Sequence, residues 1–190
     1  MNAVDVADAL VRHAPDSLYV SSLGTATSAL RKASNDGPHL YFGGAMGSAL
    51  PAALGVADAV PTRQVVALLG DGELLMGVSS LWSVSSLAPR NLVVVVLADG
   101  RYSITGGQPL AGATRFAEVA NILPGLSGAQ ATTAGELVSV LGTIPRPGLV
   151  EAVIDDRAWP GWSPFVDPHA VRARFAANVA AGPDVTSSQP

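Results

Sequence analysis

The feature that most constrains the fold is the run at residues 92–97, which contains only leucine and valine. A strand with one face in water alternates apolar and polar side chains, so an unbroken run of this kind is typical of a strand buried on both faces. Such strands occur in parallel sheets that carry helices on each side. The run therefore predicts the centre of a parallel sheet.

Other apolar runs alternate with helical patterns along the chain. We expect strands at residues 17–20, 40–42, 65–69, 92–97, 129–132 and 149–154. We expect helices around residues 29–30 and at residues 48–60, 73–87, 115–122, 134–141 and 167–181, with a long loop after residue 99. This alternation predicts an α/β fold, a doubly wound, mostly parallel open sheet with helices on both faces.

Length and composition narrow the class of protein. The 190 residues suit a single domain, expected at residues 1–181 with a disordered tail at 182–190. Hydrophobic residues make up 48% and charged residues 14%, so we expect another chain to cover part of the surface. The net charge of −4 argues against nucleic-acid binding, and the absence of cysteine excludes disulfides. No apolar run approaches the ~20 residues of a membrane span and no signal peptide is evident, so a cytoplasmic location is expected.

Acidic side chains follow two of the expected strands. Asp71 lies between Gly70 and Gly72, where the chain can turn sharply and a phosphate can approach the backbone. Asp99 follows the next strand, and parallel strands end at one edge of a sheet. A carboxylate beside a phosphate needs a cation between them, and Mg²⁺ prefers oxygen ligands. Alone, the Gly-Asp-Gly segment is better explained by an ordinary turn with a helix-capping aspartate; the pair with Asp99 favours a metal and phosphate site.

Residues 70–77, Gly-Asp-Gly-Glu-Leu-Leu-Met-Gly, and residues 97–102 resemble the thiamine-diphosphate motif, in which Gly-Asp-Gly is followed by a later asparagine. The resemblance implies thiamine diphosphate and Mg²⁺ as cofactors. It places the metal on the side chains of Asp71 and Asp99 and on the backbone carbonyl of Arg101. It also places the cofactor against Gly70, Gly72, Glu73 and Tyr102.

Two further segments carry the same resemblance. Residues 43–55 are similar to the stretch before Gly-Asp-Gly in acetolactate synthase and benzoylformate decarboxylase, which implies that Met46 supports the bent cofactor; a plain core methionine is the alternative. Residues 102–108 resemble a loop of sulfopyruvate and phosphonopyruvate decarboxylases, which makes Gln108 a candidate contact for the substrate, against a flexible surface loop. As a whole, the chain resembles the small cofactor-binding β subunit of sulfopyruvate decarboxylase and the C-terminal domain of phosphonopyruvate decarboxylase.

Weaker candidates remain near the expected strand ends. By resemblance, Gly24 and Thr25 lie near the diphosphate, although an ordinary turn and helix cap would look the same. His39 precedes a short strand and is a candidate for reaching the active site. Trp159 and Trp162 are expected to anchor the chain end or to contact a partner rather than to bind a ligand.

The sequence departs from the family pattern at two positions. Asp99 stands where asparagine is usual, and Glu73 stands where serine or alanine is common. The glutamate that thiamine enzymes place against the aminopyrimidine ring has no counterpart here. The resemblance therefore implies a separate pyrimidine-binding α subunit in a hetero-oligomer, a dimer of heterodimers or larger. The expected function is decarboxylation of a small 2-oxoacid; a carboligase subunit and a non-catalytic cofactor-binding subunit are the alternatives.

Overall fold

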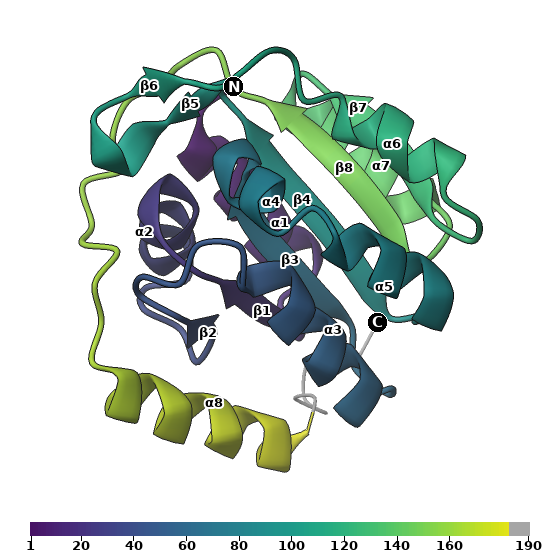
Figure 1. Cartoon of the computed structure of the whole chain (residues 1–190). Helices are drawn as coiled ribbons and strands as arrows, with labels where there is room; N and C mark the ends of the chain where they lie inside the picture. The colour runs from purple at the N-terminus through teal and green to yellow at the C-terminus, as the bar shows by residue number, and fades with distance from the viewer. Residues whose placement is uncertain (183–190) are drawn as a thin grey trace.

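The computed structural model describes residues 1–182, which form a sheet with helices packed on its two faces (Figure 1). Of the predicted tail, only Gly182 falls within the described residues; residues 183–190 lie outside them. Within the described part, no helix is long and apolar enough to cross a membrane.

Within residues 1–182, six parallel strands form one sheet in the order β2-β1-β3-β4-β8-β7. These strands are β1 (Leu18–Ser21), β2 (Leu40–Tyr41), β3 (Val65–Gly70), β4 (Leu92–Ala98), β7 (Ser127–Ala131) and β8 (Gly148–Val153). Two short strands, β5 (Arg101–Tyr102) and β6 (Gln108–Pro109), pair separately and antiparallel. The chain leaves β1 toward β2 and then returns to build the other side from β3, so the strand order reverses between β1 and β3. In open α/β sheets, ligands bind beyond the carboxyl ends of the strands at such a point.

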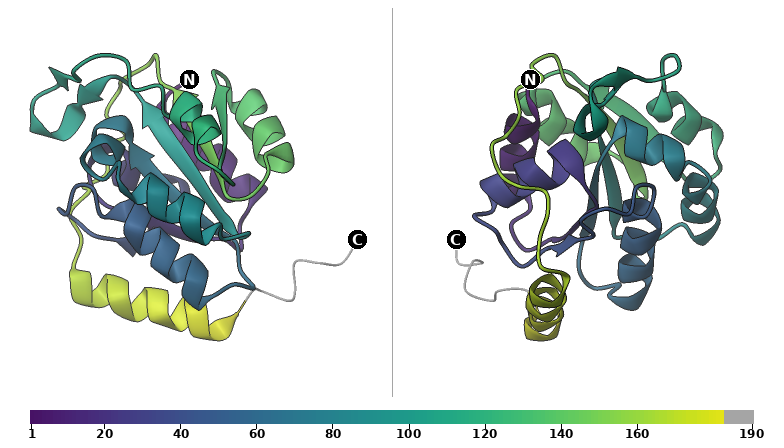
Figure 2. Two further views of the ribbon diagram at one scale, coloured as in Figure 1. Left: turned by 45° about the vertical axis from the view of Figure 1, so that its right-hand side comes forward. Right: turned by 60° about the vertical axis from the view of Figure 1, so that its left-hand side comes forward.

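Except for the C-terminal helix, the helices divide between the two faces of the sheet (Figure 2). The helices are α1 (Ala3–His13), α2 (Gly24–Ala33), α3 (Ala49–Ala59), α4 (Asp71–Met76), α5 (Ser80–Leu87), α6 (Phe116–Ile122), α7 (Ala134–Thr143) and α8 (Pro168–Ala181), with a 3₁₀ turn η1 (Ser103–Thr105). Buried residues of α1, α2 and α7 pack in one apolar cluster, and those of α3, α4, α5 and α6 pack in the other. The predicted doubly wound architecture is therefore confirmed.

Strand β4 shows how the sequence produces this sheet. Its side chains alternate between the two apolar clusters, so that Val93 and Val95 pack on one face and Val94 and Val96 on the other, all of them buried. Burying each such side chain contributes about 1.5–3 kcal/mol. A polar residue at any of these positions would lose that contribution, which is why the run contains none.

Three details differ from the sequence prediction. The helix expected at residues 73–87 is two helices, α4 and α5, separated around Gly77. The expected long loop after Asp99 contains β5, η1 and β6. Helix α1 was not predicted, although a capping box marks its start: the Asn2 side chain accepts from the Asp5 backbone, and the Asp5 side chain accepts from the Asn2 backbone.

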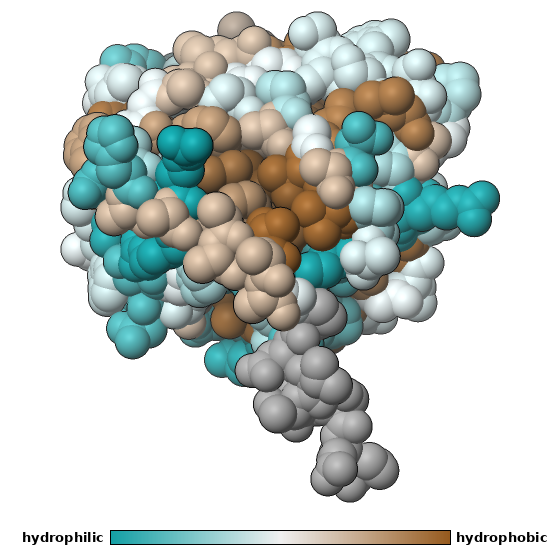
Figure 3. Space-filling view, turned by 90° about the horizontal axis from the view of Figure 1, so that it is seen from below, coloured by the Kyte–Doolittle hydropathy of each residue, from teal (hydrophilic) through white to brown (hydrophobic). Residues whose placement is uncertain are grey.

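The C-terminal helix α8 lies at one end of the molecule, beyond the short edge strand β2 (Figure 1). As predicted, Asp167 caps it and Pro168 is its first residue. Figure 3 views the molecule from this end, where apolar residues gather toward the middle of the face among polar ones. The segment leading to α8 is held on α2, because Ser28 Oγ donates to the Trp162 carbonyl at 2.5 Å and the Arg31 guanidinium lies over the Trp162 ring, 5.5 Å from its centroid. This contact fits the predicted anchoring role of Trp162.

Candidate active site

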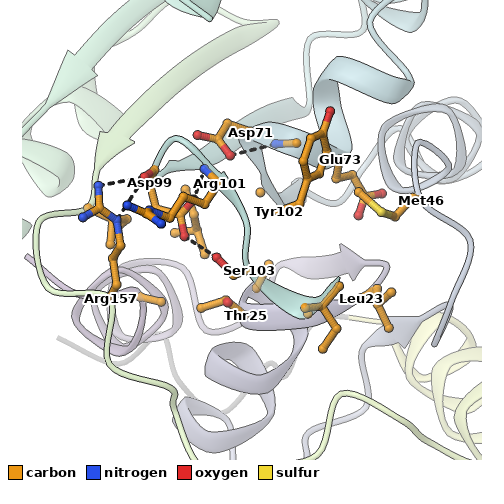
Figure 4. Close-up of a pocket in the computed structure, with 18 of the residues that line it drawn as sticks. Leu23, Thr25, Met46, Asp71, Glu73, Asp99, Arg101, Tyr102, Ser103 and Arg157 are labelled. Carbon is orange, nitrogen blue, oxygen red and sulfur yellow. Dashed lines mark hydrogen bonds between the residues drawn. The ribbon is translucent and has the colours of Figure 1, made fainter. Parts of the chain in front are cut away.

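A pocket opens beyond the carboxyl ends of β1, β3, β4 and β8 (Figure 4). It encloses about 660 Å³ together with its open mouth. Its walls come from the turns that follow these strands, from the loop before α3 and from η1. The pocket therefore lies where the strand order of an open α/β sheet favours ligand binding.

Asp71 begins α4 on the floor of this pocket and is 2% exposed. Its Oδ1 accepts the backbone N–H of Gly72, and its Oδ2 accepts the N–H of Gly100 on the neighbouring strand end, both at 2.7 Å. Burial, and to a smaller extent the nearby Asp99 carboxylate, raise the pKa of Asp71 to about 6. The fold thus holds a carboxylate where its negative charge is poorly compensated, which is the environment that a bound cation would improve.

Asp99 follows β4, and its carboxylate is fixed by its own loop. Its Oδ1 accepts the backbone N–H of Arg101 at 2.9 Å, and its Oδ2 accepts the Ser103 hydroxyl at 2.6 Å. Asp71 and Asp99 are also linked through Gly100, whose N–H binds Asp71. Two neighbouring strand ends therefore present two oriented carboxylates to one pocket.

Glu73 lies in the first turn of α4 and is 6% exposed. One carboxylate oxygen accepts the backbone N–H of Ala49 at 3.1 Å, at the start of α3, and the other accepts the hydroxyl of Ser22, at the end of β1. Burial raises the pKa of Glu73 to about 7, while the N–H groups of Ala49 and Gly47 act in the opposite direction. Glu73 lines the pocket, yet its carboxylate is engaged in joining three segments of the wall.

The loop that carries Met46 packs directly against the end of α4. A Cβ added at Gly77 would lie 2.4 Å from the Gly47 carbonyl oxygen, so the two backbones touch. Met46 itself is half-buried and lines the pocket. This contact requires glycine at position 77, and it holds the loop on which Met46 lies beside Glu73 (Figure 4).

Replacing Gly77 with alanine should therefore destabilise the protein by about 1–3 kcal/mol, because backbone atoms of the Met46 loop would have to move. Urea denaturation measures this change. Gly55→Ala on α3 is the matched control, since a Cβ there meets nothing within 4 Å and alanine favours the helix. Equal stability of the two variants would show that the Gly47–Gly77 contact does not hold the loop.

The structure brings most of the predicted site residues together. The predicted cofactor and metal residues that line the pocket are Gly24, Thr25, Met46, Gly70, Asp71, Gly72, Glu73, Asp99, Arg101 and Tyr102. The Tyr102 ring lies against Gly72, where an added Cβ would come within 2.7 Å of it. Their roles toward a ligand stay predictions, but their placement in one pocket is a property of the fold.

Gln108 does not line the pocket. It lies on β6, exposed, and its side-chain amide pairs with Thr105: the Gln108 Nε2 donates to the Thr105 carbonyl at 2.9 Å, and the Thr105 hydroxyl donates to Gln108 Oε1 at 3.0 Å. The antiparallel pairing of β5 and β6 keeps it on the short hairpin, outside the wall of the pocket.

His39 is not brought to the pocket either. It precedes β2, which pairs beside Val20 and Ser21 of β1, and its buried ring packs edge-on against Tyr19 with 4.9 Å between ring centroids. Within the described residues, neither ring nitrogen has a hydrogen-bond partner. Burial, with a smaller contribution from the positive charge of Arg174 and against the opposing effect of Asp36, lowers the pKa of His39 to about 4.

This depressed pKa predicts acid sensitivity. Because His39 takes up a proton more readily in the unfolded chain, the native state loses stability as the pH falls from about 6.5 to about 4, by up to about 3 kcal/mol. His39→Phe keeps an aromatic ring and removes the titration, so its stability should decline less over the same interval. Urea midpoints at neutral and acidic pH measure the difference, and parallel pH profiles for the two proteins would contradict it.

Several pocket residues were missed by sequence reasoning. They come from α1, from the start of α2, from the end of β4, from η1 and from the segment after β8, and are Ala3, Leu23, Ala26, Leu97, Ser103, Ile104, Ile154, Asp156, Arg157 and Ala158. A signal for part of this set was present, because the end of β8 must lie at the same edge as the ends of β3 and β4. Nothing in the pattern indicated which side chain after β8 would turn toward Asp99.

The residues of the pocket fit a divalent cation that takes part of its shell from a ligand. Within residues 1–182, no three His, Cys, Asp or Glu side chains converge as a complete metal site. Asp71 and Asp99 supply two carboxylates, and backbone carbonyls follow β4. Mg²⁺ commonly binds through one or two carboxylates together with phosphate oxygens.

An all-parallel, doubly wound sheet with carboxylates at its switch point defines an α/β protein that binds a ligand at its strand ends. The comparisons with known proteins specify the family. The family described as "Thiamine pyrophosphate enzyme, C-terminal TPP binding domain" matches this chain over residues 22–143, which is more than half of its length. The protein belongs to this family.

Related proteins agree with this placement. The phosphonopyruvate decarboxylase of Streptomyces viridochromogenes is 36% identical over 178 residues, covering 91% of this chain and 45% of the relative. Sulfopyruvate decarboxylase subunit beta of Methanothermobacter thermautotrophicus is 36% identical over 93 residues, covering 49% of this chain and 50% of the relative. The chain thus spans about half the length of these curated relatives.

A solved structure shares the fold. The thiamine diphosphate-dependent 4-hydroxybenzoylformate decarboxylase of Rhodococcus jostii RHA1 superposes with a TM-score of 0.68 at 26% sequence identity. The match covers 83% of this chain and 33% of that one. The domain therefore corresponds to one part of a larger enzyme of this kind.

Proposed function

We propose that this chain is the cofactor-binding subunit of a two-subunit thiamine-diphosphate-dependent decarboxylase that acts on a small 2-oxoacid. The observation that carries the proposal is the pair of carboxylates, Asp71 and Asp99, at the strand-end pocket of a chain in the TPP-binding family. Relatives named as decarboxylases of phosphonopyruvate and sulfopyruvate support the substrate class, a 2-oxoacid with a second acidic group.

In this proposal, Asp71 and Asp99 hold Mg²⁺, the carbonyl of Arg101 completes the protein's ligands, and the diphosphate lies against the turns at Gly24 and Gly72. Met46, on its fixed loop, supports the bent form of the cofactor. When bound, thiamine diphosphate supplies the electron sink for carbanion chemistry, and the protein positions and activates it. Tyr102 shields the Asp71 turn on the open side of the pocket.

The proposed partner is a separate pyrimidine-binding α subunit that supplies the missing glutamate. The relatives named as beta subunits support a two-subunit arrangement. Exposed apolar side chains on α4 and α5 also support it: Leu75, Met76 and Trp82, here called the α4–α5 surface, are 36%, 60% and 56% exposed. Exposed apolar groups of this size are typical of a protein interface.

Trp82→Ser should weaken association with the partner, because it removes a large aromatic group from this α4–α5 surface, and such groups contribute about 2 kcal/mol or more at an interface centre. Ile122→Ser on α6 is the matched control, since Ile122 is 80% exposed on a different helix. Co-purification of the two subunits at graded salt measures the effect. An equal loss of association in both variants would show that the α4–α5 surface is not the specific interface.

The direct test of the proposed function is reconstitution. The full chain, co-expressed with a partner of similar size that carries a strand-end glutamate, is supplied with Mg²⁺, thiamine diphosphate and either sulfopyruvate or phosphonopyruvate. Release of CO₂ with formation of the aldehyde supports the proposal. Cofactor binding without turnover of either acid would reject the substrate class, and absence of cofactor binding would reject the function.

A further inference from the structure

Arg157 is one of the pocket residues that the sequence pattern did not indicate and that lie beyond the family match at residues 22–143. It follows β8 on a segment that continues the sheet, because the Ile154 N–H donates to the Ala98 carbonyl at 3.0 Å. This brings Arg157 beside the end of β4, although 58 positions separate it from Asp99.

The guanidinium of Arg157 makes two hydrogen bonds to a single backbone oxygen. Its Nε and Nη2 both donate to the carbonyl of Asp99, at 3.1 and 2.9 Å, as Figure 4 shows. The other end of the same peptide unit is the N–H of Gly100, which donates to Asp71 Oδ2 at 2.7 Å. The Asp99–Gly100 peptide is therefore held at its oxygen by Arg157 and at its nitrogen by Asp71.

Without the contacts to Arg157 and Asp71, the plane of this peptide could rotate. Gly100 has φ +73°, and glycine tolerates both orientations of the preceding peptide plane. A turn of the plane would point the Asp99 carbonyl away and withdraw the N–H from Asp71. It would also move the start of the loop in which Arg101 and Ser103 orient the Asp99 carboxylate.

We propose that Arg157 is a positioning residue: by fixing the Asp99–Gly100 peptide, it sets the relative orientation of the Asp71 and Asp99 carboxylates. It acts through the backbone rather than on a ligand. Two donors on one carbonyl oxygen are charge-assisted and restrict rotation better than one. The consequence for Mg²⁺ and cofactor binding rests on the proposed function, whereas the effect on the peptide does not.

The test compares Arg157→Ala, Arg157→Lys and the control Arg172→Ala in the full chain. Arg172 is exposed on α8 and outside the pocket, so its removal changes the charge equally. The first readout is amide hydrogen exchange at Gly100, followed by NMR without any ligand. In Arg157→Ala the exchange should accelerate about tenfold relative to amides within β3 and β4, in Arg157→Lys less, and in Arg172→Ala not at all.

The second readout is the affinity for thiamine diphosphate with Mg²⁺, measured by calorimetry on the reconstituted complex, which should fall about tenfold in Arg157→Ala and partly recover in Arg157→Lys. Unchanged Gly100 exchange in Arg157→Ala overturns the proposal. A loss of affinity with unchanged exchange also overturns it, since Arg157 would then contact the ligand directly. Faster exchange in a protein that binds no cofactor supports the positioning role and rejects the proposed function instead.

Discussion

Asp71→Ala is expected to lower the Mg²⁺-dependent affinity for thiamine diphosphate by about 100-fold or more. Losing even an outer partner of a metal ligand commonly costs 10- to 100-fold in affinity, and Asp71 is proposed to bind the metal itself. Its carboxylate is buried on the pocket floor, with two backbone N–H groups fixing its orientation. Calorimetric titration of the reconstituted complex with the cofactor, with and without Mg²⁺, measures the loss.

Asp58→Ala is the matched control, because Asp58 is an exposed acid on α3 that does not line the pocket. It removes the same charge and should leave the affinity unchanged. Wild-type affinity in Asp71→Ala would reject the metal site, whereas equal losses in both variants would show that net charge, rather than coordination, is what matters.

Glu73→Ala should destabilise the protein by about 2–4 kcal/mol. It leaves the Ser22 hydroxyl and the Ala49 N–H, both in buried surroundings, without an acceptor, and each such group costs about 1–3 kcal/mol. Glu73→Gln should cost much less. The pKa of about 7 means that the native carboxyl is about half protonated near neutral pH, and the amide oxygen can still accept one of these donors.

Urea denaturation of the three proteins at neutral pH gives the comparison. The expected order of stability is wild type, then Gln close below it, then Ala well below. An alanine variant as stable as the wild type would show that Glu73 does not join β1, α3 and α4. A glutamine variant as unstable as alanine would show that the negative charge, rather than the hydrogen bonding, is essential.

The sheet could be predicted because burial on both faces leaves a direct trace in the sequence. In β4 every residue from Leu92 to Leu97 is buried, so the pattern and the structure carry the same information. The division between α4 and α5 could not be predicted in this way. It depends on the contact of Gly77 with Gly47, a tertiary contact between segments far apart in sequence. Helix α1 carries a readable signal in the sequence, the capping pair Asn2 and Asp5 at its start.

The same distinction applies to the candidate site: some of its residues could be placed from the strand pattern, and others could not. Asp71 and Asp99 could be placed because each directly follows a recognisable strand, and parallel strands end at one edge. Gln108 and His39 lie outside the pocket, and their positions depend on details that periodicity does not encode: the short β5–β6 pairing and the packing of His39 against Tyr19. Arg157 was missed because its role arises only when the segment after β8 meets the Asp99 carbonyl.

In the proposed function, this pocket binds thiamine diphosphate through a metal held by Asp71 and Asp99. The most direct measurement is a calorimetric titration of the reconstituted complex with thiamine diphosphate, first with Mg²⁺ and then with excess chelator. We expect saturable binding with Mg²⁺ that is lost with chelator. Binding of equal strength under both conditions, or no binding under either, would contradict it.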